Sequence, residues 1–172
     1  MIAGAVIPTS GTIAYSWEGK VLDPGKIYKH ISIAAPYLTL IEEFTWEEHL
    51  KFHHSLKPFQ PGLSIQDVLH LSGLEAQRHK PIKYFSSGMK QRARLALAFA
   101  SKTDILLLDE PLQNLDKSGM DWYSGLVGEF LKDRLCFVAS NHQEKEYFFC
   151  DEEISILDFK GVSKIQPLVQ GQ

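Results

Sequence analysis

The sequence predicts an α/β domain with a mostly parallel sheet. This class is indicated by one apolar strand that has a predicted helix before it and another after it in the sequence. The run from Ile105 to Leu108 has no polar alternation, which is typical of a strand buried on both faces. Pro111 soon follows and ends the strand, because proline cannot donate a hydrogen bond within a sheet. Residues 89–101 are rich in good helix formers, and residues 117–134 carry an amphipathic pattern.

Composition places the chain among globular proteins of one domain. Its 172 residues are 44% hydrophobic and 23% charged, and a chain of this length buries a substantial core. A net charge of −3 gives no reason to expect a nucleic-acid partner. No apolar run reaches membrane-spanning length and no signal-peptide pattern opens the sequence, so membrane attachment would need another protein. Cys136 and Cys150 lack metal-ligand spacing, and we expect buried, reduced thiols.

Two acids stand where the central strand ends. Asp109 and Glu110 directly follow the apolar run, and ligands of open α/β sheets bind beyond the carboxyl ends of the strands. One acid can hold Mg²⁺ through water, and the other can orient a water for attack on a phosphoryl group. The alternative is a core strand that merely ends in two solvated acids.

The helix before the strand begins with a small polar tip. Ser86 and Ser87 can cap the helix, and Gly88 allows another group to approach the backbone closely. Free N–H groups at such a helix start bind phosphate. The alternative here is an ordinary capped helix.

The remaining elements follow from shorter patterns. Thr45 and Glu48 form a capping box that opens a helix to about His54, and Ser64 opens a second helix. His49, His53 and His54 have spacing that can bind a metal, although a partly packed, solvated helix face is the preferred interpretation. Further strands are predicted at residues 12–15, 31–35, 136–139 and 154–159, and a short helix at 143–149, with the strands at 31–35 and 136–139 expected to be buried.

Taken in order, these motifs resemble the nucleotide-binding subunit of an ATP-binding cassette (ABC) transporter, a P-loop NTPase-like fold. Four stretches carry the resemblance. Phe85–Met89 matches the family's signature, and Asp109–Glu110 matches its Walker B acids. Asn114–Asp116 matches the D-loop, and Ser140–His142 matches the switch histidine. The weaker likeness extends from Met1 to about Phe159. It implies an ABC ATPase domain over 1–172, present in part, with a helical subdomain inserted at about 42–100. In relatives this subdomain contacts the permease, and Phe44, Trp46, Phe52 and Phe59 are aromatics that could serve there or form its core.

The resemblance implies a role for each matched residue. Family members bind two ATP molecules with Mg²⁺ between two subunits arranged head to tail. Ser86, Ser87 and Gly88 would face the γ-phosphate held by the partner subunit. The roles implied for the others are Mg²⁺ binding for Asp109, polarisation of the attacking water for Glu110, γ-phosphate contact for His142 and linkage of the two sites for Asp116. A transmembrane permease would be the further partner, with the subunit cytoplasmic and peripheral on the inner face of the cell membrane.

Two departures from the family pattern shape the expectations. The phosphate loop G-x-x-x-x-G-K-[ST] is absent from the sequence, and no glutamine lies between Met1 and Phe59 where the Q-loop belongs. We therefore expect an N-terminally truncated domain, with weak ATP binding by the chain alone and exposed apolar surface. A degenerate, non-catalytic subunit that completes a partner's ATP site is the alternative, and an unrelated Mg²⁺-dependent α/β protein is a third reading.

Overall fold

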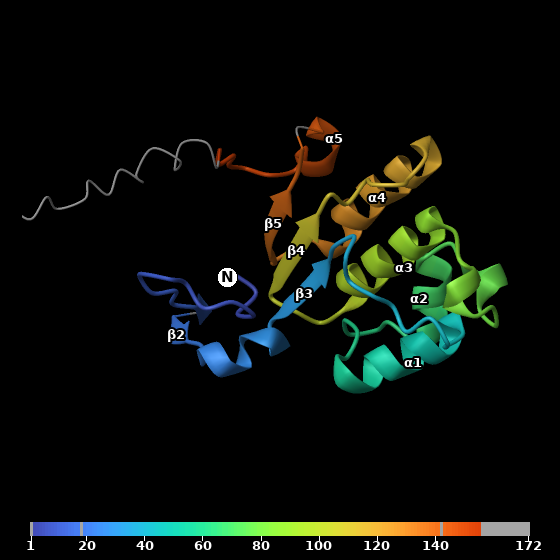
Figure 1. Cartoon of the computed structure of the whole chain (residues 1–172), viewed down its shortest axis with the longest axis horizontal. Helices are drawn as coiled ribbons and strands as arrows, with labels where there is room; N and C mark the ends of the chain where they lie inside the picture. The colour runs from blue at the N-terminus through green and yellow to red at the C-terminus, as the bar shows by residue number, and fades with distance from the viewer. Residues whose placement is uncertain (1, 18, 142, 156–172) are drawn as a thin grey trace, which may run out of the picture.

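A three-stranded parallel sheet lies at the centre of the computed structural model, which describes residues 2–17, 19–141 and 143–155 (Figure 1). The strand order is β3 (Ile31–Ala34), β4 (Ile105–Asp109) and β5 (Leu135–Ala139). All pairs are parallel, so the carboxyl ends of the three strands meet at one edge. This confirms the predicted sheet and the predicted position of its central strand.

One face of the sheet packs against two long helices. Ala34, Leu106 and Leu108 point toward this face, where they join the core formed by α3 (Ser87–Ala100) and α4 (Lys117–Phe130). Phe99 and Tyr123 meet edge to face at the centre of that core, with ring centroids 6.1 Å apart. The predicted helices on either side of β4 are therefore present, and both cover the same face of the sheet.

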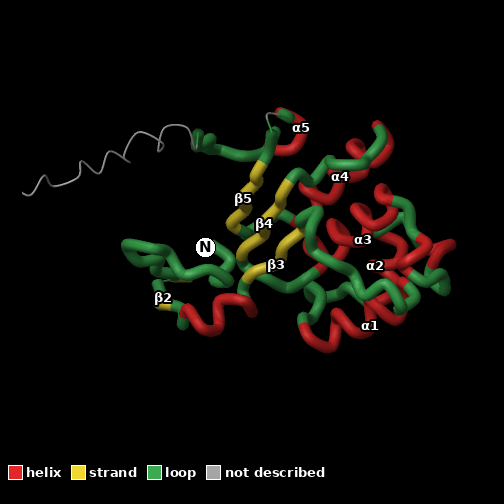
Figure 2. Tube along the Cα trace, in the orientation of Figure 1, coloured by secondary structure: helices red, strands yellow, loops and turns green. Residues whose placement is uncertain are grey.

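The opposite face is only partly covered. Ile27, on the 3₁₀ helix η1 (Pro24–Lys29), packs on the beginnings of β3 and β4, near a small hairpin visible in Figure 2. Ile33 and Phe137 farther along this face are 36% and 38% exposed, and Leu135 is 49% exposed. Exposed apolar surface was expected, but burial of the strand at 136–139 was not confirmed. The prediction was wrong because β5 is the edge strand of the described sheet.

The N-terminal hairpin differs from the predicted strand at 12–15. Its strands are β1 (Ser16–Trp17) and β2 (Lys20–Val21), paired antiparallel. Gly19 has φ 74, a left-handed conformation that glycine adopts at little cost, and it lies in the turn between the two strands. The strand predicted at 12–15 therefore lies before the observed hairpin.

A second group of helices has its own core. The helix α1 (Trp46–Leu56) begins at Thr45 with the predicted capping box to Glu48, and α2 (Ile65–Leu71) begins at Ser64 with a similar box. Their apolar sides form one cluster with one side of α3. The largest members of this cluster are Trp46, Leu50, Phe59, Leu69, Ile82 and Phe85. Trp46 and Phe59 are thus core residues, whereas Phe52 is 42% exposed.

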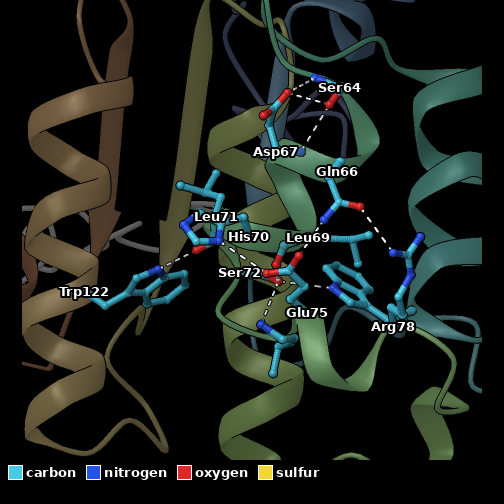
Figure 3. Close-up of polar contacts among 12 residues, drawn as sticks. Ser64, Gln66, Asp67, Leu69, His70, Leu71, Ser72, Glu75, Arg78 and Trp122 are labelled. Carbon is cyan, nitrogen blue, oxygen red and sulfur yellow. Dashed lines mark hydrogen bonds and ion pairs between the residues drawn. The ribbon is translucent and has the colours of Figure 1, made fainter.

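Two indole rings hold α2 between its neighbours (Figure 3). Trp122 of α4 donates from Nε1 to the carbonyl oxygen of Leu71 at 2.7 Å. Trp46 of α1 donates to Ser72 Oγ at 3.2 Å, and Ser72 in turn donates to the carbonyl oxygen of Leu69. These bonds satisfy the end of α2, where backbone carbonyls lack helical partners, and they join the helical group to α4.

The last described segments are short. The helix α4 ends at Phe130 rather than at the predicted Arg134, because the chain turns at Asp133, which has φ 58. The predicted short helix is α5 (Glu144–Tyr147). The strand predicted at 154–159 falls mostly outside the described residues, and Ile154 is not in a strand. In the described part of the chain, no helix is both long and apolar enough to cross a bilayer.

Candidate functional site

The two acids lie at the carboxyl edge of the sheet, as predicted. Asp109 is the last residue of β4 and is half-buried, and Glu110 leaves the strand with φ 43. Its N–H still donates to the carbonyl oxygen of Ala139, the last residue of β5, at 2.9 Å. A left-handed conformation at a residue other than glycine costs about 1–3 kcal/mol and persists only where the surroundings impose it. The neighbouring strand therefore fixes the place where Glu110 turns away.

The carboxylate of Glu110 is held by two side-chain amides. Gln113 Nε2 donates to Oε2 at 2.9 Å, and Asn141 Nδ2 donates to Oε1 in a short contact. The first amide comes from the loop after β4, and the second from the loop after β5. The carboxylate of Asp109 makes no hydrogen bond or ion pair with any residue in the described ranges.

The polar helix tip packs against the loop that follows the acids, residues 110–116, which we call the acid loop. Ser86 is the N-cap of α3, and its Oγ accepts from the N–H of Met89 at 3.2 Å. Ser86 and Ser87 are exposed, and Gly88 faces the acid loop: a Cβ on Gly88 would lie 2.9 Å from the carbonyl oxygen of Asn114. The predicted phosphate-facing tip thus packs on the loop that follows the predicted acids.

Asp116 closes the acid loop by capping the next helix. Its Oδ1 accepts from the N–H of Gly119 at 2.7 Å and begins α4. Asn114, two residues earlier, has φ 63, a conformation that asparagine tolerates better than most residues. One oxygen of Asp116 is therefore committed to the helix start.

Two buried polar side chains, which the sequence analysis did not predict as part of the site, form hydrogen bonds with the backbone of the acid loop. Gln91 of α3 is 1% exposed and donates from Nε2 to the carbonyl oxygen of Pro111 at 2.9 Å. Glu146 of α5 is fully buried and accepts from the N–H of Leu112 at 3.2 Å. A polar residue inside an apolar helical pattern was the available signal for Gln91, but nothing in the pattern names its partner.

His142 lies outside the described residues, so its predicted position at the edge of the sheet stays a prediction. The three histidines of α1 are packed rather than gathered around a metal. His49 is buried, His53 Nε2 lies 2.9 Å from Ser101 Oγ, and His54 Nδ1 accepts from the N–H of Phe59. Burial lowers the pKa of both His49 and His53 to about 4. No group of three or more potential metal-binding side chains occurs within the described ranges.

The two cysteines are free and half-buried. Burial raises the pKa of the Cys136 thiol to about 12 and also raises that of Cys150. A raised pKa disfavours the reactive thiolate. The expected burial of the two thiols was met only in part, since both side chains are half-buried.

An α/β sheet with acids at its carboxyl edge, and a capped helix start packed on the loop after them, is the arrangement expected of a nucleotide-binding α/β domain. A family model described as "ABC transporter" matches residues 1–113, more than half of the chain. The chain belongs to the ABC transporter family.

Bacterial relatives carry the same family name. The chain is 35% identical over 120 residues to the uncharacterized ABC transporter ATP-binding protein YcbN of Bacillus subtilis, and the match covers 70% of this chain and 39% of YcbN. It is 29% identical over 151 residues to the uncharacterized YybJ of the same organism, with 87% of this chain and 69% of YybJ covered. The bacitracin transport ATP-binding protein BcrA of Bacillus licheniformis is 29% identical over 143 residues, 83% of this chain and 47% of BcrA. The chain thus spans less than half of YcbN and of BcrA.

Solved structures give the same fold. An ATP-binding subunit of an ABC transporter superposes with a TM-score of 0.71 at 25% identity, over 87% of this chain and 64% of that chain. A dimeric ATP-binding cassette in a post-hydrolysis state, bound to ADP and Pi, superposes with a TM-score of 0.69 at 20% identity, over 86% and 69%. These matches confirm the P-loop NTPase-like α/β fold class that the motifs predicted.

Proposed function

We propose that this chain acts as the ATP-binding and ATP-hydrolysing subunit of an ABC transporter, paired with a second nucleotide-binding subunit and a membrane permease. The observation that supports the proposal is the position of Asp109 and Glu110 at the carboxyl edge of the sheet, with Gly88 of the helix tip packed on the loop that follows them. Family membership supports the ATPase class, since relatives are named as ATP-binding proteins of transporters.

The two carboxylates of the acid pair are suitable groups for Mg²⁺-ATP chemistry. The Asp109 carboxylate, which makes no hydrogen bond or ion pair within the described ranges, can accept hydrogen bonds from the hydration shell of Mg²⁺, which keeps several waters when bound to protein. When bound, the ion would neutralise charge on the transferred phosphoryl group. Glu110 is held in place by Gln113 and Asn141, and an oriented carboxylate can accept a hydrogen bond from the attacking water.

The helix tip suits a phosphate bound by the partner subunit. Ser86 and Ser87 are exposed, and the first N–H groups of α3 have no helical partners. In the proposed pair, Ser86, Ser87 and Gly88 face the partner's γ-phosphate. His142 is proposed to contact the γ-phosphate bound by its own subunit, and Asp116 to link the two sites through the loop that it closes.

The helical group at about 42–100 is proposed as a subdomain that meets the permease. Its separate core around Trp46 and Phe85 supports treating it as one packed unit. Phe52 and Leu56 of α1 are 42% and 71% exposed and offer apolar surface to a partner. Through that contact the chain would sit at the inner face of the cell membrane.

A trapped dimer tests the proposal. Glu110→Gln keeps the shape of the side chain but removes the carboxylate that accepts from water, so ATP-bound pairs should accumulate. The measurement is light scattering after size exclusion with millimolar ATP and Mg²⁺, since the sequence lacks G-x-x-x-x-G-K-[ST] and the expected affinity is weak. Glu129→Gln, on the exposed side of α4, is the matched control. Equal dimer fractions for the two variants would contradict the proposed role of Glu110.

A further inference from the structure

The loop that follows β3 and the acid loop that follows β4 leave the sheet side by side. The two strands are parallel neighbours, with Ala34 opposite Leu108, so both loops begin at the carboxyl edge (Figure 1). We call residues 35–40 the β3 loop. Its turn is closed by a single local bond, from the N–H of Leu38 to the carbonyl oxygen of Ala35 at 3.1 Å. Leu38 is 44% exposed, so the turn needs an anchor elsewhere in the chain.

Arg94 of α3 supplies that anchor. Its side chain is half-buried and donates from Nε to the carbonyl oxygen of Leu38 at 2.8 Å. This carbonyl oxygen accepts from no other group in the described ranges. Arg94 forms no ion pair with any described residue, so its N–H groups serve uncharged oxygens. A charged donor makes the stronger kind of hydrogen bond, and the place of the β3 loop therefore depends on α3.

The same guanidinium also reaches Gln91, one turn earlier on α3. Nη1 of Arg94 donates to Gln91 Oε1 at 3.4 Å, a contact that i and i+3 positions of a helix allow. The bond is long, but Gln91 is 1% exposed and its Oε1 has no other donor in the part of the chain that the structure describes. A buried oxygen without a donor carries a desolvation penalty, so Arg94 is the group that satisfies this amide.

The chemistry of its two neighbours fixes the orientation of the Gln91 amide. Gln91 Nε2 donates to the carbonyl oxygen of Pro111 at 2.9 Å. Arginine can only donate and a carbonyl oxygen can only accept, so the amide oxygen must face Arg94 and the amide nitrogen must face Pro111. Hydrogen bonds in such a chain polarise and strengthen one another. One continuous chain of bonds thus links Leu38 in the β3 loop to Pro111 in the acid loop.

We propose that Arg94 is a positioning residue that sets the acid loop against the β3 loop. It holds the β3 loop directly through Leu38, and it holds the acid loop through Gln91 and Pro111. Because Pro111 directly follows Glu110, this chain of bonds also sets where the Glu110 carboxylate stands. The consequence for Glu110 rests on the proposed function, whereas the link between the two loops does not.

Amide hydrogen exchange followed by NMR tests the link without any need for ATPase activity. The N–H groups of Leu112 and Gln113 are hydrogen-bonded in the acid loop, so their exchange rates report its local opening. Arg94→Met should speed both rates about fivefold relative to the amides of α1, which report opening elsewhere in the chain. In a Gln91→Met background the same substitution should add nothing at Leu112 and Gln113, because the connecting amide is gone.

Two results in folded variants would overturn the proposal. One is an unchanged ratio of acid-loop to α1 exchange in Arg94→Met, and the other is an equal acceleration with and without Gln91. Arg92→Met is the matched control: Arg92 lies on the same helix, but its guanidinium stacks on the Trp122 ring at 4.7 Å. This control should leave the ratio unchanged, and an acceleration as large as that of Arg94→Met would also count against the assignment.

A measurement on the unmodified chain keeps the test decisive if Arg94→Met does not fold. The Nε–H of Arg94 should exchange at least about tenfold more slowly than that of free arginine at the same pH, because it is bonded to Leu38. Exchange at the free rate would overturn the anchor. The dimer assay with Glu110→Gln reports on the proposed function separately, so a missing dimer beside the expected exchange rates would reject that function and leave the positioning role of Arg94 in place.

Discussion

Gly88 at the start of α3 and Asn114 in the acid loop touch so closely that no side chain fits between them. A Cβ on Gly88 would stand 2.9 Å from the carbonyl oxygen of Asn114, a distance that real Cβ atoms essentially never show. Asn114 presents that oxygen from a left-handed conformation, with φ 63. The helix tip and the acid loop, which the sequence offered as separate motifs, are thus fixed against each other by backbone contact.

Replacement of Gly88 by alanine should therefore destabilise the fold. The atom that a new methyl group would meet belongs to the backbone, which cannot rotate aside as a flexible side chain would. We expect Gly88→Ala to lower the free energy of unfolding by about 1–3 kcal/mol, the usual cost of overpacking. Urea denaturation followed by circular dichroism measures the change.

Gly128→Ala is the matched control for that substitution. Gly128 lies inside α4, and a Cβ there would meet no atom within 4 Å. Alanine is the better helix former by about 1 kcal/mol, so this variant should gain stability. Equal effects of the two substitutions would show that the contact with Asn114 does not limit stability.

A second prediction concerns the amide that supports the acid loop. Gln91→Met keeps the length of the side chain but removes the donor to Pro111, whose carbonyl oxygen would be left unpaired. The expected loss is about 1–3 kcal/mol in the free energy of unfolding, the penalty for a buried unsatisfied group. Gln77→Met is the control, since the Gln77 side chain makes no hydrogen bond within the described ranges. A loss of similar size at Gln77 would contradict this account.

Local signals predicted much of the fold. The capping box at Thr45 and Glu48 and the apolar run of β4 are decided by neighbours in sequence, and both are found where expected. The burial of β5 depends on what lies beside it in the sheet, and an apolar run alone does not give that information. The end of α4 was misplaced because the amphipathic pattern continues into Leu131 although the backbone turns at Asp133.

The positions of the candidate site residues could be predicted, but the side chains that support them could not. Asp109, Glu110 and the helix tip were expected at the ends of elements, and the structure has them there. Gln91 and Glu146, which hold the acid loop, act through one backbone carbonyl and one backbone N–H. The backbone group that each side chain meets depends on how the helices pack, and it cannot be predicted from spacing in the sequence.

A third prediction follows from Arg134, which donates hydrogen bonds at the carboxyl ends of α3 and α4. Its guanidinium donates to the carbonyl oxygens of Ala98, Phe99 and Phe130 at 3.1–3.4 Å, and to Ser32 Oγ and Thr103 Oγ1. The carbonyl ends of helices attract cations, although burial lowers the pKa of Arg134 to about 10. Arg134→Met should cost about 3 kcal/mol because several acceptors lose their donor at once.

Thermal and urea unfolding of Arg134→Met, beside Arg134→Lys and the exposed Lys132→Met, measures this cost. Lysine restores the charge but lacks the planar fork that reaches several acceptors, so it should recover only part of the stability. Full recovery by lysine would indicate that charge alone matters, and an unaffected Arg134→Met protein would contradict the proposed role in holding the helix ends.

The fourth prediction is that acid weakens the fold through the histidines of α1. His49 and His53 have a pKa of about 4 in the folded chain, lowered by burial, whereas an unfolded histidine titrates near about 6.5. Between these values the unfolded chain binds protons that the folded chain rejects, so stability is full above about pH 6.5 and falls as the pH approaches 4. From about pH 7.5 to pH 5 the expected loss is about 1–2 kcal/mol for each histidine.

Urea unfolding at those two pH values measures the loss, and the lower value stays above the range where most carboxylates titrate. The double variant His49→Leu, His53→Leu should lose much less stability between the two pH values, because leucine binds no proton in either state. His79→Gln, at an exposed position, is the control and should keep the acid sensitivity of the unmodified chain. If the double variant were as acid-sensitive as the control, the destabilising protons would have to bind elsewhere.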